Sequence, residues 1–130
     1  MMLADTNVLS ELARPEPNAG AVEWARSVSE ISLSVVSVEE IAFGLSWKPN
    51  IRVAAWFDEF LDGYCHVLPV TREIAKASGR LRGRLQSRGV PRTQADMLIA
   101  ATAQHHQLTL VTRNERDFEG CGIAVLNPFS

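Results

Sequence analysis

The chain has 130 residues, 46% of them hydrophobic, and its formal net charge at pH 7 is −2. These values predict one globular domain over residues 1–130, exclude a disordered chain, and argue against a general nucleic-acid binder. No apolar run is long enough to cross a bilayer and the first residues lack a basic signal-peptide segment, so we expect a cytoplasmic protein.

Short apolar segments alternate with amphipathic segments along the chain. In chain order we expect strand 1–4, helices 8–13 and 21–27, strand 31–36, helices 37–47 and 52–61, strand 66–70, helices 71–88 and 93–105, and strands 108–112 and 123–126. Ser37 is the expected cap of the third helix. This alternation predicts a three-layer α/β/α sandwich with a central, mainly parallel sheet.

Four acidic residues are expected at one edge of this sheet. Asp5 directly follows the first strand, and Asp117 lies in the loop after strand 108–112. Glu40 is one helical turn beyond strand 31–36, and Asp96 lies in the first turn of a strongly apolar helix. Open α/β sheets bind ligands beyond the carboxyl ends of their strands. The four acids are therefore a candidate site.

Each acid also has a structural explanation. Asp5 is placed to cap the helix that follows it, and Asp117 fits a surface turn. Glu40 is three residues after Ser37, and Asp96 is three residues after Thr93; both are capping-box patterns. A capping residue faces the strand ends, so the two roles are compatible.

An acidic cluster predicts binding of a hard divalent cation. Two carboxylates about 4 Å apart repel by on the order of 4 kcal/mol at an effective dielectric near 20. Oxygen ligands favour Mg²⁺ or Mn²⁺ over zinc, and neither the cysteines nor the adjacent His105 and His106 have zinc spacing. Such a cation activates water and stabilises charge on a phosphodiester, which indicates nuclease chemistry.

The segments that carry these acids resemble the PIN-domain family and, within it, the VapC-type toxins of bacterial toxin–antitoxin pairs. The matching segments are Leu3-Ala4-Asp5-Thr6-Asn7, Ser37-Val38-Glu39-Glu40, Ala95-Asp96-Met97-Leu98-Ile99-Ala100, and Leu110-Val111-Thr112-Arg113-Asn114 with Asp117-Phe118. The ending Val125-Leu126-Asn127-Pro128-Phe129 is similar to the FitB-type branch. The resemblance implies a PIN-like fold and an Mg²⁺-dependent endoribonuclease, with Mn²⁺ as a plausible substitute.

The resemblance also implies partners and residue roles. A cognate antitoxin, a small DNA-binding protein, would hold the enzyme inactive; the toxin would be a homodimer that forms a larger assembly with it. Asp5 and Asp96 would be the principal metal ligands, with Glu40 and Asp117 acting directly or through water. Thr6, Thr112 and Asn114 would support them. The branch often has Asp where this chain has Asn114, so Asn114 and Asp117 are both candidates for the fourth position.

A basic stripe runs along the helix expected at residues 71–88. It consists of Arg72, Lys76, Arg80, Arg84 and Arg88, spaced four apart on one helix ridge. The stripe fits either a solvated helix face or a surface that contacts RNA phosphates or an acidic antitoxin segment. The family resemblance further suggests a groove for an antitoxin helix, lined by Val8, Leu9, Leu12, Trp47, Trp56, Phe57 and Phe60.

Two other functions compete with the nuclease. One is a non-catalytic PIN-like module that binds RNA or protein, in which the acids serve only as caps. The other is a phosphotransferase with Asp5 as nucleophile, although such sites commonly place a second acid two residues on, where this chain has Asn7. Dependence on Mg²⁺ distinguishes the nuclease from the binding module.

Overall fold

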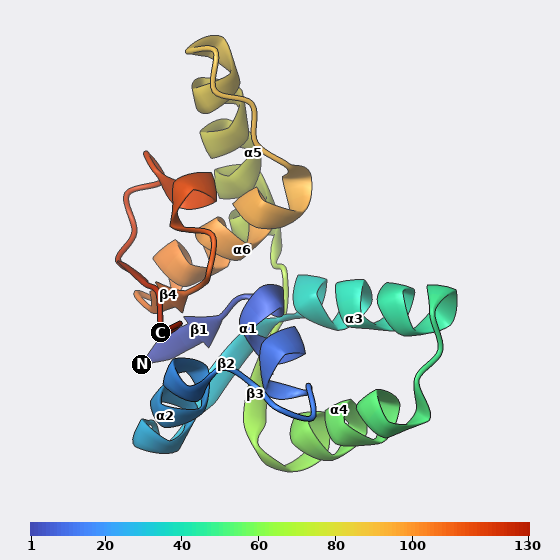
Figure 1. The fold of residues 1–130 in the computed structure, drawn as a ribbon. Coiled ribbons are helices and arrows are strands. Elements are labelled where there is room, and N and C mark those ends of the chain that lie inside the picture. Colours follow the sequence, from blue (N-terminus) through green and yellow to red (C-terminus); the bar gives the residue numbers. More distant parts are fainter.

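The computed structural model describes residues 1–130, and its centre is a five-stranded parallel sheet. Figure 1 shows the sheet between two groups of helices. The strand order is β3-β2-β1-β4-β5. The strands are β1 (Met2–Ala4), β2 (Ile31–Ser34), β3 (Cys65–Leu68), β4 (Thr109–Val111) and β5 (Val125–Leu126). The prediction of a mainly parallel sheet is confirmed.

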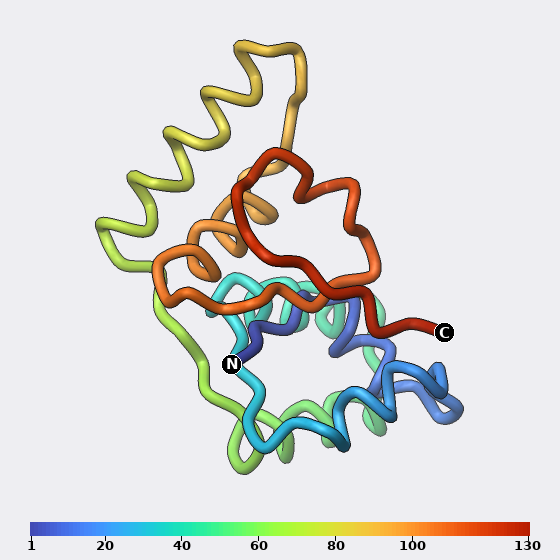
Figure 2. Tube along the Cα trace, turned by 90° about the vertical axis from the view of Figure 1, so that its left-hand side faces the viewer, coloured from blue at the N-terminus to red at the C-terminus, as the bar shows by residue number.

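Helices cover both faces of this sheet. They are α1 (Thr6–Leu12), α2 (Ala19–Ser27), α3 (Val35–Trp47), α4 (Ile51–Gly63), α5 (Arg72–Ser87), α6 (Gln94–His105) and the 3₁₀ helix η1 (Glu115–Phe118). Figure 2 shows the chain turned by 90°, with α5 reaching away from the rest of the molecule. None of these helices combines the length and apolar character that a membrane span requires.

Two hydrophobic clusters pack against opposite sheet faces. Leu3 and Leu110 belong to a cluster with residues of α5 and α6, whereas Ala4 and Val111 belong to one with residues of α1 to α4. Successive side chains of a strand point to opposite faces, so each central strand contributes to both layers. The predicted three-layer α/β/α sandwich is therefore confirmed, and its apolar central strands are explained by burial on both sides.

The sequence prediction placed the junction of β2 and α3 incorrectly. Ser34, rather than Ser37, is the N-cap of α3, and its Oγ accepts a hydrogen bond of 3.0 Å from the backbone N–H of Val36. The helix therefore begins at Val35, inside the segment expected to be strand. Ser37 lies inside the first turn and its Oγ is bonded to Thr6 Oγ1, so the capping box between Ser37 and Glu40 does not form. The β-branched pair Val35–Val36 favoured a strand, but the buried Ser34 cap starts the helix earlier.

The C-terminal segment docks on the beginning of α2. The backbone N–H of Ser130 donates to Oδ1 of Asn18 at 3.0 Å, and Nδ2 of Asn18 donates to the Ser130 carbonyl at 3.2 Å. Gly20 lies beneath this contact. A Cβ at position 20 would be 2.4 Å from the carbonyl oxygen of Pro128, which is too close for any side chain.

Replacing Gly20 by Ala should lower the free energy of unfolding by about 1–3 kcal/mol, because the added methyl group displaces the C-terminal segment. Gly79→Ala is the matched control, since a Cβ there has no neighbour within 4 Å. That change should stabilise α5 by about 0.5–1 kcal/mol. Urea unfolding measures both values, and equal stabilisation by the two substitutions would contradict the docked C-terminal segment.

Candidate metal centre

A polar pocket of about 510 Å³ lies where the carboxyl ends of the central strands meet α1, α3, α6 and η1. Eleven residues line it and none is hydrophobic. Asp5, Glu40, Asp96 and Asp117 are among them, so the structure brings together the four acids that the sequence singled out. We call this the acidic pocket.

Asp5 is the most buried of the four acids, with 5% of its surface exposed. It ends β1 and caps α1, because its Oδ1 accepts a hydrogen bond of 2.8 Å from the N–H of Thr6. Its Oδ2 accepts hydrogen bonds from Thr112 Oγ1 at 2.8 Å and Asn7 Nδ2 at 3.3 Å. Burial is the main cause that raises the pKa of Asp5, and the charges of Asp96 and Glu40 add to the rise, so that the pKa reaches about 6 despite the bonds from Thr112 and Thr6.

Asp96 lies in the first turn of α6, as the sequence predicted. The Oγ1 of the N-cap Thr93 accepts a hydrogen bond of 3.1 Å from the Asp96 N–H, which fixes the start of the helix. Burial raises the pKa of Asp96, and the charges of Asp117 and Glu40 add to the rise. Both acids with raised pKa values therefore carry negative charge that the surrounding protein does not fully compensate.

Glu40 is held through a hydroxyl pair. Thr6 Oγ1 is 2.7 Å from Glu40 Oε1 and 2.8 Å from Ser37 Oγ. A threonine hydroxyl has one proton, and an ionised carboxylate only accepts. Thr6 therefore donates to Glu40, and Ser37 donates to Thr6. The sequence analysis predicted the supporting role of Thr6. It missed that of Ser37, because a serine at that position also fits a helix cap.

Thr112 connects the remaining parts of the pocket. Its fully buried Oγ1 donates to Asp5 and accepts from Asn7 Nδ2 at 3.2 Å and from the Asn114 N–H at 3.1 Å. Asn114 precedes η1, on which Asp117 is partly buried, and both side chains line the pocket. The candidates for the fourth position therefore lie in the same pocket, and only Asp117 supplies a carboxylate.

These residues fit a hydrated hard cation better than an enclosed metal cage. No group of three or more His, Cys, Asp or Glu side chains is close enough as it stands to hold an ion. Mg²⁺, however, usually retains several waters and binds proteins through one or two carboxylates. Asp5 and Asp96 could provide such a pair, because a nearby positive charge would offset the burial that raises their pKa values.

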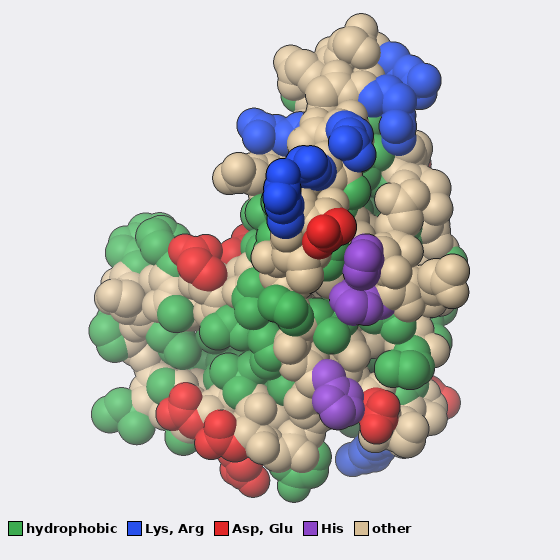
Figure 3. Space-filling model, turned by 180° about the vertical axis from the view of Figure 1, so that it is seen from behind, with side chains coloured by type: hydrophobic (Ala, Val, Ile, Leu, Met, Phe, Trp, Pro, Cys, Tyr) green, Lys and Arg blue, Asp and Glu red, His purple; other side chains and the backbone are tan.

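The basic stripe lies outside the acidic pocket. Arg72, Lys76, Arg80, Arg84 and Arg88 are all exposed on or at the end of α5, and none belongs to an ion pair. Figure 3 shows Lys and Arg side chains gathered over the upper part of the molecule, where α5 projects. The stripe is free to meet a separate polyanion or partner, but it does not line the candidate metal site.

An apolar groove opens between α2 and α4, with a volume of about 510 Å³. Leu12, Trp56 and Phe60 line it as the sequence suggested, together with Val22 and Tyr64. The same suggestion was wrong for Val8, Leu9 and Phe57, which are buried core residues. Trp47 does not line this groove; it is 70% exposed, pairs with Phe43 and lines a separate hollow, so its contact with an antitoxin helix stays a prediction.

Comparison with known proteins supplies the family. The model of the PIN domain matches residues 2–121. Toxin FitB of Neisseria gonorrhoeae is 33% identical over 99% of both chains. The VapC ribonuclease Y4jK of Sinorhizobium fredii is 31% identical, over 99% of this chain and 98% of its own length. The chain belongs to the PIN-domain family.

A solved structure supports the same relationship. The structure of FitAB bound to an IR36 DNA fragment contains a chain that is 31% identical and superposes with a TM-score of 0.85, over 100% of this chain and 96% of the other. The resemblance to the FitB and VapC branch, first seen in short motifs, is thus confirmed over nearly the whole chain.

The buried Asp5 predicts a pH-dependent difference between the metal-free wild type and the Asp5→Asn variant. The pKa of Asp5 rises from 3.8 to about 6 on folding, so the ionised carboxylate costs stability above pH 6. As the pH falls from 7 towards 4, the folded wild type takes up a proton and gains about 2–3 kcal/mol relative to Asp5→Asn. Urea unfolding in EDTA at a series of pH values measures this gain. A difference that does not change with pH would contradict a buried, titrating Asp5.

Proposed function

We propose that residues 1–130 form a single nuclease domain that cleaves RNA internally with the help of Mg²⁺, for which Mn²⁺ can substitute. The observation that carries this proposal is the convergence of Asp5, Glu40, Asp96 and Asp117 on one polar pocket of a PIN-domain fold. A relative that is named a VapC ribonuclease aligns over 99% of this chain and supports the assignment.

Each residue of the pocket has a distinct role in this proposal. Asp5 and Asp96 hold the cation, and Glu40 and Asp117 hold its waters or contact it directly. Thr6 orients Glu40, whereas Thr112 orients Asp5 and the Asn114 backbone. The bound cation supplies neutralisation of phosphodiester charge and a water of lowered pKa. Burial of the acids limits screening by solvent, so their attraction for the cation is stronger than it would be at the surface.

We further propose that the protein is a toxin controlled by a cognate antitoxin, a small DNA-binding protein, in the cytoplasm. Relatives named Toxin FitB and VapC ribonuclease, and the FitAB complex with DNA, support this assignment. The apolar groove of Leu12, Val22, Trp56, Phe60 and Tyr64 suits the apolar face of an antitoxin helix. A homodimer is the expected form of the toxin, with a larger assembly when the antitoxin binds.

Asp5→Asn should reduce Mg²⁺-dependent cleavage by more than about 100-fold, since even residues that only support a metal ligand contribute about 10–100-fold. Asp58→Asn is the matched control, because Asp58 is exposed on α4 and outside the pocket. Gel mapping of total RNA with Mg²⁺ or EDTA measures the cleavage, and circular dichroism checks the fold.

The same experiment decides between cleavage and binding alone. A nuclease loses its activity in EDTA and on replacement of Asp5, whereas Asp58→Asn leaves it intact. If a folded Asp5→Asn protein cleaves as well as wild type, the metal assignment is wrong. If the wild type binds RNA without cutting it at any Mg²⁺ concentration, the protein is a non-catalytic module.

Thr6→Val should weaken Mn²⁺ binding by about 10–100-fold, because Glu40 loses the hydroxyl that orients it. Thr6→Ser keeps the hydroxyl and should retain most of the affinity. Calorimetric titration of the three proteins with Mn²⁺ measures the effect. Equal affinities for wild type and Thr6→Val would show that the orientation of Glu40 does not matter for the ion.

A further inference from the structure

Two arginines line the acidic pocket, and metal binding does not explain them. Arg14 follows α1 and Arg113 follows β4, and both line the pocket together with Asp5. Positive side chains repel the cation that the acids attract, so they do not serve the ion. They do suit an anionic substrate that must approach five pocket carboxylates, namely Asp5, Glu11, Glu40, Asp96 and Asp117.

Arg14 is held in place by Glu11. Its Nη1 donates to Glu11 Oε1 at 3.2 Å, and the backbone N–H of Asn18 donates to Glu11 Oε2 at 2.9 Å. The bond from Asn18 is the main reason that the pKa of Glu11 is lowered, so the carboxylate stays ionised. Glu11 is 8% exposed at its side chain and Arg14 is 64% exposed. The Arg14 guanidinium thus uses one N–H group of five within the chain, on a side chain that is largely exposed.

Arg113 is held in a different way that leaves its donors free. Its guanidinium carbon lies 4.8 Å from the centre of the Phe129 ring, and its backbone N–H donates to Asn7 Oδ1 at 3.2 Å. The Arg113 side chain makes no hydrogen bond within the chain. Stacking on an aromatic ring fixes the plane of a guanidinium without using its N–H groups.

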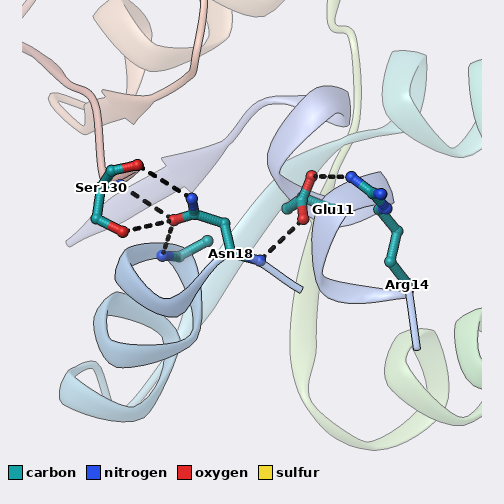
Figure 4. Close-up of polar contacts among 5 residues, drawn as sticks. Glu11, Arg14, Asn18 and Ser130 are labelled. Carbon is teal, nitrogen blue, oxygen red and sulfur yellow. Dashed lines mark hydrogen bonds and ion pairs between the residues drawn. The ribbon is translucent and has the colours of Figure 1, made fainter. Parts of the chain in front are cut away.

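A single residue, Asn18, connects the supports of the two arginines. Its backbone amide binds Glu11, and its side chain binds Ser130, the residue after Phe129. Figure 4 shows this continuous path of contacts from Ser130 through Asn18 and Glu11 to Arg14. The docked C-terminal segment thereby holds Phe129 under Arg113, and the same junction anchors Glu11 beside Arg14.

We propose that Arg14 and Arg113 bind a backbone phosphate of the RNA next to the phosphate that is cut. This inference rests on the proposed ribonuclease function and adds the residues that hold the substrate. Guanidinium groups pair with phosphate through two parallel N–H bonds. Both arginines lie near Glu11, since the charge of each lowers its pKa, and the formal charges of the three side chains sum to +1. Phe129 is a positioning residue that acts through Arg113.

The test is binding of a fluorescein-labelled single-stranded RNA of mixed sequence, followed by anisotropy in EDTA at several salt concentrations. Arg14→Ala and Arg113→Ala should each weaken binding by about tenfold and each reduce the slope of log affinity against log salt, and the double variant should lose about 0.7, the value for one phosphate contact on a single strand. Arg113→Lys should keep the slope, because it keeps the charge. Arg26→Ala is the control, since Arg26 is exposed on α2 outside the acidic pocket.

Cleavage kinetics separate positioning from binding. Phe129→Leu keeps both arginines and an apolar side chain, so it should raise KM for RNA without changing kcat or the salt slope. Unchanged affinity and slope in both alanine variants would overturn the phosphate-binding role. Failure of the wild type to cleave RNA with Mg²⁺ would instead refute the nuclease, and the binding measurements would still decide what the arginines contact.

Discussion

The hydrogen bond from Thr112 to Asp5 joins the ends of β4 and β1 at the centre of the sheet, and the rest of the acidic pocket is arranged around it. Both residues are buried, so this 2.8 Å contact holds a carboxylate where water cannot easily solvate it. Asp5 also begins α1 through the amide of Thr6, and Thr6 in turn binds Glu40 from α3. In the proposed function, the side chain that caps α1 is therefore also a metal ligand.

The acidic pocket holds five carboxylates and two arginines, so its lining carries an excess of negative charge that would favour a cation. Burial raises the pKa values of Asp5 and Asp96, and the neighbouring carboxylates raise them further. A divalent ion would relieve the repulsion at neutral pH, whereas protonation of Asp5 relieves it only at about pH 6 and below. The buried carboxylates lower the free energy of unfolding, whereas the two hydrophobic clusters that pack on either side of the sheet raise it.

Much of the fold and all four acids could be predicted from the sequence, because apolar strands and acids at strand ends follow from local patterns. The cap of α3 could not, since Ser34 and Ser37 are both fully buried serines near the same junction, and only the extended backbone of Ser34 marks it as the cap. Arg14, Glu11 and Phe129 were also missed. Their importance depends on the contact between Asn18 and Ser130, which are 112 positions apart and have no shared motif. Val8, Leu9 and Phe57 illustrate the same limit, since their hydrophobicity suggested the lining of a groove and the structure buries them in the core.

Manganese anomalous scattering from crystals of the full chain tests the central claim most directly. The account predicts one or more manganese peaks inside the acidic pocket, with oxygen atoms of Asp5 and Asp96 as direct ligands and Glu40 or Asp117 bound directly or through water. Crystals of the Asp5→Asn variant should lose the peak. Ordered manganese found only at surface carboxylates elsewhere, with the acidic pocket filled by water alone, would contradict the account.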